Sequence, residues 1–506
     1  MPTSEIDIES QLQRAETLRR QNRFRDAAGI YQAILRAKPD HAETLYQFGV
    51  MANMAGQHAL AADVISRAVR VAGSLGIRYL PELAPALALS GRHEEALAAF
   101  RRVTDARPND ATAHYNMGNL LNRMGKPDEA AAAFRRAAAL SPDFVEAHAN
   151  LGAALHLAKR YDNAIAAYRR ALEIEPDSAD LHHNLGAVYR ATGKHDAAAE
   201  CYRQAVQRAP DRLVFQERLA ATLQDLGACD EAANAFRRVL ARAPGSVDAA
   251  KGLAEALIGA GKPAEAGALC DEYLAGRGYN SAILCCKAIA LGELGEEAAA
   301  RRIMNFDRFV RPCPIVPPKG FRDVAAFNAA IEQEIRGEDS LGFEPAGLAT
   351  AKGFQTGEML EQPSYATGLL AMMINGAVRG YIDSLPDDPD HPFVAAAPAR
   401  WTLNGWGVIL QAQGHQRAHI HPSGWLSGVY YVRVPRAIGS GSQQGWIEFG
   451  EPPANIGCRR VHQTRRVAPE AGRMLLFPSY VYHRTIPFQD SENRISFAFD
   501  VVPLKG

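Results

Sequence analysis

Residues 111–144 read ATAHYNMGNLLNRMGKPDEAAAAFRRAAALSPDF, and residues 145–178 read VEAHANLGAALHLAKRYDNAIAAYRRALEIEPDS. Small, aromatic and proline residues stand at the same places in both segments, and the pattern continues along the chain with a step of 34 residues. The proline column is Pro108, Pro142, Pro176, Pro210 and Pro244. An aromatic column keeps the same step: Phe134, Tyr168, Tyr202 and Phe236. This period predicts a repeated helix pair.

Each column of the repeat has a physical reason. The glycines of one column (Gly118, Gly152, Gly186) let a neighbouring helix approach the first helix closely. The aromatic side chains of the second helix are expected to pack into the following repeat. The prolines end the second helix, because proline lacks an N–H and biases the preceding residue away from helix.

The 34-residue pattern resembles the tetratricopeptide repeat, a helix–turn–helix unit, over residues 9–310. About eight repeats are expected, followed by a capping helix pair at 281–310 that covers the terminal face. The repeats are placed near 9–40, 41–74, 77–110, 111–144, 145–178, 179–212, 213–246 and 247–280. The resemblance implies a concave groove for a protein or peptide partner, with a dimerisation surface or a spacer as the alternative.

Histidines also follow the 34-residue step, at His114, His148 and His182, with His183 beside the last. Equivalent positions in successive repeats lie about one helix pair apart, whereas metal–ligand distances are near 2 Å. We therefore expect these histidines to line a groove or the surface rather than to share an ion.

The composition excludes several classes of protein. The chain has 506 residues and a formal net charge of +0, so there is no electrostatic reason to expect nucleic acid or an anionic membrane as a partner. The seven cysteines include no Cys-x-x-Cys pair, which favours reduced thiols. Neither a leader pattern nor an apolar run of about 18 residues occurs. A soluble, cytoplasmic protein is expected.

Residues 311–322, RPCPIVPPKGFR, end the helical pattern and are typical of a proline-rich linker. Beyond them we expect a second domain over 323–506. Residues 323–336 and 364–383 have the pattern of amphipathic helices, and from about residue 399 short apolar alternations are broken by glycine and proline. Strands are expected near 407–411, 427–432, 446–449, 474–477 and 495–499. The predicted fold is multidomain: an all-α solenoid, then a double-stranded β-helix (jelly-roll) domain with flanking helices.

The second domain contains a set of residues suited to metal chemistry. Residues two apart in an extended segment share a face, so His419 and His421 can reach one metal ion. His483 follows an expected strand and can supply a third imidazole. Arg494 and Ser496 also share a face, and a guanidinium beside a hydroxyl suits one carboxylate of a dicarboxylate.

This set, together with SGVYYV at 427–432, FPS at 477–479 and the segment at 349–356, resembles the 2-oxoglutarate- and iron(II)-dependent oxygenase family over about residues 305–503. The resemblance implies Fe(II) as the metal, 2-oxoglutarate as cosubstrate and O2 as oxidant. It assigns His419, His421 and His483 to the metal, and Arg494 with Ser496 to 2-oxoglutarate. No catalytic residue beyond the metal site is assigned.

The chain departs from the usual motif of this family, His-x-Asp or His-x-Glu followed by a distant histidine, because His421 stands at the third position. Three interpretations remain open. All three histidines bind the metal, which we prefer. Alternatively, one histidine of the pair binds and a carboxylate such as Glu448 completes the site. In the third interpretation only two histidines bind, and His421 supports them without touching the metal.

The sequence thus predicts a dioxygenase that hydroxylates a protein or peptide recruited by the repeats. Its main rival is an adaptor whose repeats bind a partner and whose jelly roll is catalytically inactive. A glycosyltransferase is disfavoured, because the C-terminal part lacks the alternating strand–helix pattern and the Gly-rich phosphate turn of a nucleotide-sugar fold.

Overall fold

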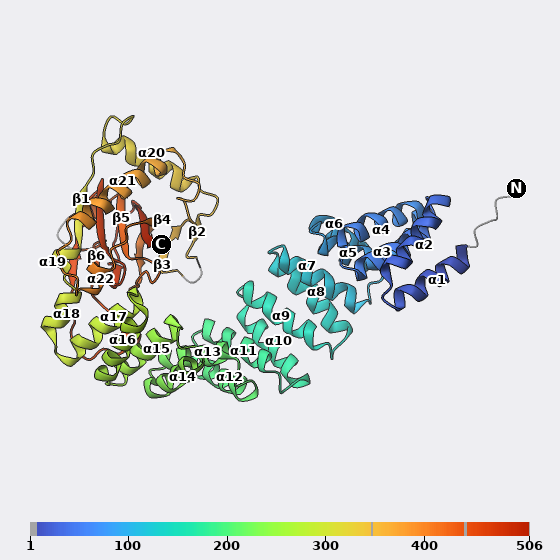
Figure 1. The fold of residues 1–506 in the computed structure, drawn as a ribbon, viewed down its shortest axis with the longest axis horizontal. Coiled ribbons are helices and arrows are strands. Elements are labelled where there is room, and N and C mark those ends of the chain that lie inside the picture. The colour runs from blue at the N-terminus through green and yellow to red at the C-terminus, as the bar shows by residue number, and fades with distance from the viewer. Residues whose placement is uncertain (1–7, 346–347, 440–442, 505–506) are drawn as a thin grey trace. The chain divides into compact units, whose positions relative to one another are not determined.

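The computed structural model describes residues 8–345, 348–439 and 443–504 (Figure 1). These residues form two compact units, divided between Phe215 and Gln216. Within the described residues, we find no helix that combines the length and the apolar character needed to cross a membrane.

The first unit consists of paired helices that follow the sequence period, which confirms the predicted solenoid (Figure 1). Helix α13 (Leu213–Asp225) crosses the division between the units. The elements that precede it are α1 (Ile8–Arg20), α2 (Phe24–Ala37), α3 (Ala42–Met54), α4 (His58–Ala72), η1 (Gly73–Tyr79), α5 (Leu80–Leu89), α6 (His93–Ala106), α7 (Ala111–Arg123), α8 (Pro127–Leu140), α9 (Val145–Leu157), α10 (Tyr161–Ile174), α11 (Ala179–Ala191) and α12 (His195–Arg208).

The glycine and aromatic columns meet each other inside a repeat. A Cβ atom added to Gly118 would lie 2.7 Å from the Phe134 ring, and one added to Gly152 would lie 2.8 Å from the Tyr168 ring. The aromatic ring therefore fills the space that glycine leaves in its own repeat. The expected packing into the next repeat also occurs: a Cβ atom added to Gly252, on the first helix of the following repeat, would lie 2.3 Å from the Phe236 ring.

The periodic histidines are held separately. The Nε2 atoms of His114, His148 and His182 hydrogen-bond the proline carbonyl six residues earlier, at 3.2, 3.0 and 2.9 Å. Among the described residues, none of them belongs to a group that could hold a metal. They close the turns between repeats.

The second unit begins with the last paired helices and continues into strands. Its helical part after α13 comprises α14 (Cys229–Arg242), α15 (Val247–Gly259), α16 (Pro263–Arg277), α17 (Ser281–Leu294), α18 (Glu297–Ile303) and α19 (Phe306–Phe309). The remainder comprises β1 (Arg311–Pro314), α20 (Val324–Arg336), β2 (Gly342–Phe343), β3 (Thr350–Gln355), α21 (Tyr365–Asp383), α22 (Pro392–Ala395), β4 (Trp401–Gln416), β5 (Leu426–Arg433), η2 (Arg436–Gly439), β6 (Ile447–Phe449), η3 (Ala454–Ile456), β7 (Arg465–Val467), β8 (Arg473–Pro478), β9 (His483–Thr485) and β10 (Arg494–Pro503).

The strands form two antiparallel sheets, in keeping with the predicted jelly roll. The larger sheet has the order β1-β8-β5-β10-β4-β3-β2, and the smaller has the order β7-β6-β9. Aromatic rings of the two sheets pack together: the ring centroids of Phe449 on β6 and Phe477 on β8 are 4.9 Å apart. Strand β1 comes from the segment expected as a linker and pairs with β8 at the edge of the larger sheet.

Helices support the strands from both ends of the domain. Helix α20 packs on β5 (Figure 1), where Asn328 donates to the Val432 carbonyl over 2.8 Å. The last repeat helices hold the turn before β9: Tyr480 donates to the Ile303 carbonyl over 2.6 Å, and Tyr482 donates to Glu255 over 3.1 Å. These contacts fix the backbone immediately before His483.

Candidate metal centre

The three histidines singled out in the sequence converge between the two sheets. His419 and His421 lie in the extended segment between β4 and β5, and His483 opens β9. His419 and His483 exchange two backbone hydrogen bonds of 3.1 Å, and the His421 N–H donates to the Ser479 carbonyl over 3.1 Å. One ring nitrogen of each histidine lies within 4.8 Å of the others.

The hydrogen bonds of these histidines fix the orientation of each ring. His419 Nδ1 donates to the Arg417 carbonyl over 2.7 Å, and His421 Nδ1 donates to Asp500 Oδ2 over 2.9 Å. His483 Nδ1 donates to the Val481 carbonyl over 3.1 Å. In the neutral form of each ring the proton therefore lies on Nδ1, and Nε2 presents a lone pair. The Nε2 atoms of His421 and His483 are 3.2 Å apart. Two such lone pairs repel each other unless a cation lies between them.

The site favours neutral imidazoles, the form that binds metals. Burial, followed by the neighbouring His421, lowers the pKa of His419 to about 4. Burial, followed by the neighbouring His419, also lowers the pKa of His483 well below its ordinary value. Imidazole nitrogens gathered in this way fit Fe(II).

Asp500 is a site residue that the sequence analysis missed. Its Oδ1 accepts a hydrogen bond of 2.7 Å from Ser427, while its Oδ2 accepts the His421 Nδ1–H. The Trp406 ring stacks on His421 with a centroid distance of 5.6 Å. A signal was present in the sequence: Asp500 lies an even number of residues after Arg494 and Ser496 on one strand, so it shares their face.

Arg494 and Ser496 lie on β10, where Ser496 pairs with Tyr431 of β5. Both are buried, and the Arg494 guanidinium lies 5.1 Å from the centroid of the Tyr431 ring. Its Nε has no hydrogen-bond partner, and no described carboxylate forms an ion pair with it. Burial lowers the pKa of Arg494. A buried guanidinium without a counter-charge fits an anionic ligand such as a carboxylate.

A hollow of about 370 Å³ opens beside the histidines. Its lining includes His419, His421, Asp500 and Trp406, together with Gln355 from the upstream segment 349–356. Gln355 accepts a hydrogen bond of 2.8 Å from Thr350. The volume suits a small ligand next to the imidazoles.

The structure does not bring Glu448 to the histidines. Its neighbour Phe449 pairs with His483, so Glu448 projects from the opposite face of β6. There it accepts hydrogen bonds of 2.6 Å from both Arg466 and Arg484. Burial raises the pKa of Glu448, but the two guanidinium groups outweigh burial and hold it below its ordinary value.

Comparison with protein families identifies both parts of the chain. A family model described as "Putative 2OG-Fe(II) oxygenase" matches residues 404–500. Tetratricopeptide repeat models match residues 12–74, 115–179, 155–224 and 223–277, and a further TPR repeat model matches 86–125. The chain therefore joins tetratricopeptide repeats to a domain of the 2OG-Fe(II) oxygenase family.

Several solved structures are similar to part of the chain. The C-terminal part of a TPR repeat-containing protein from Cytophaga hutchinsonii is 15% identical, with 48% of this chain and 99% of that chain covered and a TM-score of 0.43. MamA from Desulfovibrio magneticus RS-1 is 23% identical (34% and 97% covered, TM-score 0.32). YrrB, described as a TPR protein with an unusual peptide-binding site, is 19% identical (37% and 95% covered, TM-score 0.33). The comparison with curated proteins gave no match.

Proposed function

We propose that the protein is a 2-oxoglutarate- and Fe(II)-dependent dioxygenase that hydroxylates a protein or peptide. In this proposal residues 323–506 form the catalytic domain and residues 9–310 recruit the substrate. The observation that carries it is that one ring nitrogen of each of the three histidines lies within 4.8 Å of the others, while each Nδ1 forms a hydrogen bond with an oxygen.

The proposal assigns binding residues to Fe(II) and to 2-oxoglutarate. His419, His421 and His483 would hold Fe(II), and Arg494 with Ser496 would hold the distal carboxylate of 2-oxoglutarate. When bound, iron and 2-oxoglutarate together supply the activation of O2 for C–H hydroxylation. The family match at residues 404–500 supports this chemistry.

The other residues of the site would keep its geometry and its protonation. Asp500 holds the proton on His421 Nδ1 and so leaves Nε2 free, and Ser427 holds the carboxylate of Asp500 in place. Phe477 and Trp406 would limit the approach of water to the imidazoles. The ring centroids of Phe477 and His483 are 4.7 Å apart, and the Trp406 ring stacks on His421.

The repeats support a macromolecular substrate, because a second contact raises the local concentration of the residue to be modified. All seven cysteines lie in the described part of the chain and are free thiols. That state is compatible with a reducing compartment, and we include the cytoplasm in the proposal.

The test is a succinate assay. Full-length protein is incubated with Fe(II), 2-oxoglutarate and O2, and succinate is measured for the wild type, for His483→Ala and for the matched control Arg484→Ala, which alters the next residue of β9. Succinate is expected from the wild type and the control only. A thermal shift with Mn(II) and 2-oxoglutarate keeps the test informative when substrate is missing. If no metal-dependent shift or turnover occurs in the wild type, the proposal fails and the adaptor function takes its place.

A further inference from the structure

A second group of metal-ligating side chains lies away from the three histidines, where the last repeat helices meet the connection between β6 and β7. Glu293 stands on α17, and Cys458 and His462 stand on the connection. One ligand atom of each residue lies within 4.8 Å of the others. The Glu293 and His462 side chains are 5% and 13% exposed, so the group is largely shielded from water.

The local backbone brings these three side chains together. Glu293 lies one residue before the end of α17, and the connection turns at Gly457, whose φ of +73° lies in the left-handed region. The N–H groups of Arg459 and Arg460 then donate to the two oxygens of Glu293 over 2.9 and 3.0 Å. His462 Nε2 lies 3.0 Å from Glu293 Oε1. A carboxylate has about four lone-pair directions, so Glu293 can accept both amides and still bind a cation.

The donor set favours one class of metal. Thiolate, imidazole and carboxylate are the three donors that Zn(II) combines in proteins, and the Cys-x-x-x-His spacing is short enough for both ligands to come from one loop. With Cys458 as thiolate, Glu293 and the thiolate carry two negative charges, which one divalent cation neutralises. We propose that Glu293, Cys458 and His462 bind a zinc ion that is distinct from the iron site.

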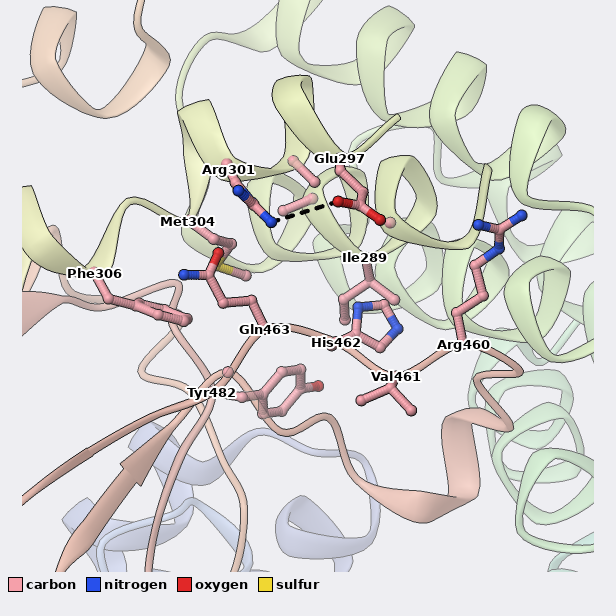
Figure 2. A pocket seen from close by; sticks show the side chains of 14 residues that line it. Ile289, Glu297, Arg301, Met304, Phe306, Arg460, Val461, His462, Gln463 and Tyr482 are labelled. Atoms are coloured by element: carbon pink, nitrogen blue, oxygen red, sulfur yellow. Dashed lines mark hydrogen bonds and ion pairs between the residues drawn. The ribbon is translucent and has the colours of Figure 1, made fainter. Parts of the chain in front are cut away.

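The neighbouring arginines do not oppose this charge balance at close range. A Cβ atom added to Gly261, just after α15, would lie 2.5 Å from Arg459 Nη1, and one added to Gly295, just after α17, would lie 2.8 Å from Arg460 Nη1. Both guanidiniums therefore lie at helix C-termini, where the helix dipole favours positive charge. Figure 2 shows the Arg460 side chain extending away from the His462 ring.

Of the three residues, His462 borders an open hollow. His462 lines a hollow of about 560 Å³ between the repeat helices and the connection, together with Glu297, Arg301 and Tyr482 (Figure 2). Where zinc has three protein ligands and open space beside them, water or a small ligand takes the fourth coordination position. The zinc would tie α17 to the connection that leads from β6, the strand that pairs with β9, and would thereby brace the strand that carries His483.

The test uses Co(II), because thiolate ligation of Co(II) gives a near-ultraviolet charge-transfer band that the three-histidine site cannot give. Full-length, chelator-treated protein with His419, His421 and His483 all changed to Ala is titrated with Co(II) and then with Zn(II). One equivalent of Co(II) is expected to produce the band, and Zn(II) is expected to abolish it. Binding through the Cys458 thiolate is expected to release the thiol proton.

Two variants separate ligation from folding. Cys458→Ser is expected to abolish the band, whereas the matched control Cys313→Ser, a half-buried thiol outside the group, keeps it. Glu293→Gln retains an acceptor for the backbone amides and is expected to weaken Zn(II) binding at least about tenfold. If no thiolate band forms, or if Glu293→Gln and Cys458→Ser leave the Zn(II) affinity unchanged, the three side chains are only a hydrogen-bonded clamp and the zinc site is refuted. Neither result depends on dioxygenase activity.

Discussion

The histidines of the repeats and the histidines of the jelly roll make opposite use of the same side chain. His114, His148 and His182 recur every 34 residues, and each bonds the carbonyl of a proline in its own turn. His419, His421 and His483 have no regular spacing, yet their ring nitrogens converge. Regular spacing in a solenoid keeps equivalent side chains apart, whereas antiparallel pairing brings distant segments face to face.

The two sets also differ in which nitrogen is engaged. In the repeats Nε2 makes the hydrogen bond to the proline carbonyl, so the outer end of the ring is occupied. In the jelly roll Nδ1 makes the hydrogen bond and Nε2 remains free. A histidine whose Nδ1 is held by an oxygen is prepared as a metal ligand.

The largest effect is expected from changing a converging histidine. His483→Ala removes one of the three proposed ligands and should lower Co(II) affinity at the three-histidine site at least about 100-fold, because a site of three ligands would lose one donor and its geometry. Isothermal titration in a Cys458→Ser background isolates this site. His148→Ala is the control and should bind as the parent does. Equal losses in both variants would erase the distinction between the two sets.

The next effect concerns the anion that would accompany the metal. Arg494→Met removes the buried guanidinium and should weaken 2-oxoglutarate binding about 30- to 5,000-fold, the range for truncating one partner of a buried charge pair. Metal affinity should change little, since the guanidinium is expected to bind the carboxylate and not the metal. Binding is measured by the 2-oxoglutarate-dependent thermal shift in the presence of Mn(II), with Arg484→Met as the control. An unchanged shift would remove Arg494 from the site.

Glu448 sharpens the comparison within the jelly roll, because sequence alone left it as an alternative ligand. Glu448→Gln should keep the metal affinity within about threefold and lower the free energy of unfolding by about 1–3 kcal/mol at pH 7, since its charged hydrogen bonds to Arg466 and Arg484 are weakened. Urea titration and metal titration measure the two effects. Loss of metal binding would instead make Glu448 a ligand.

The loss of stability caused by Glu448→Gln should depend on pH in one direction. The pKa of Glu448 is lower in the folded protein than in the unfolded chain, where a glutamate titrates near about 4.3. Its contribution to stability is therefore complete above that value and is lost as the pH falls through the folded pKa. The stability gap between wild type and Glu448→Gln should be constant from pH 6 to 8 and should narrow below about pH 4. A gap that widens in acid would contradict the ion pairs.

The smallest effect is expected in the repeats. His148→Ala removes one partly exposed hydrogen bond to the Pro142 carbonyl and should lower the free energy of unfolding by no more than about 1 kcal/mol. Urea unfolding of the full chain measures the change. If the free energy of unfolding fell by several kcal/mol, or if the variant lost a bound metal ion, the periodic histidines would be acting together.

Much of this architecture was predictable because local patterns report it. The proline, glycine and aromatic columns place the helix pairs, and alternating apolar residues place β4, β5, β6, β8 and β10. Strands β1 and β9 were missed because each is short and takes its pairing from a partner far along the chain. Asp500 was missed for a related reason: its role depends on Ser427 and His421, which lie on other segments.

The sequence by itself determined the repeat period, the jelly-roll class and the list of residues able to bind a metal, because each follows from spacing or residue type along the chain. Only the tertiary structure decided that Glu448 turns away from His483, that Asp500 turns toward His421, and that Glu293 meets Cys458 and His462. The physical reason is that side-chain direction and hydrogen-bond partners are fixed by cross-strand register and by the docking of distant segments. Neither is written in any local stretch of residues.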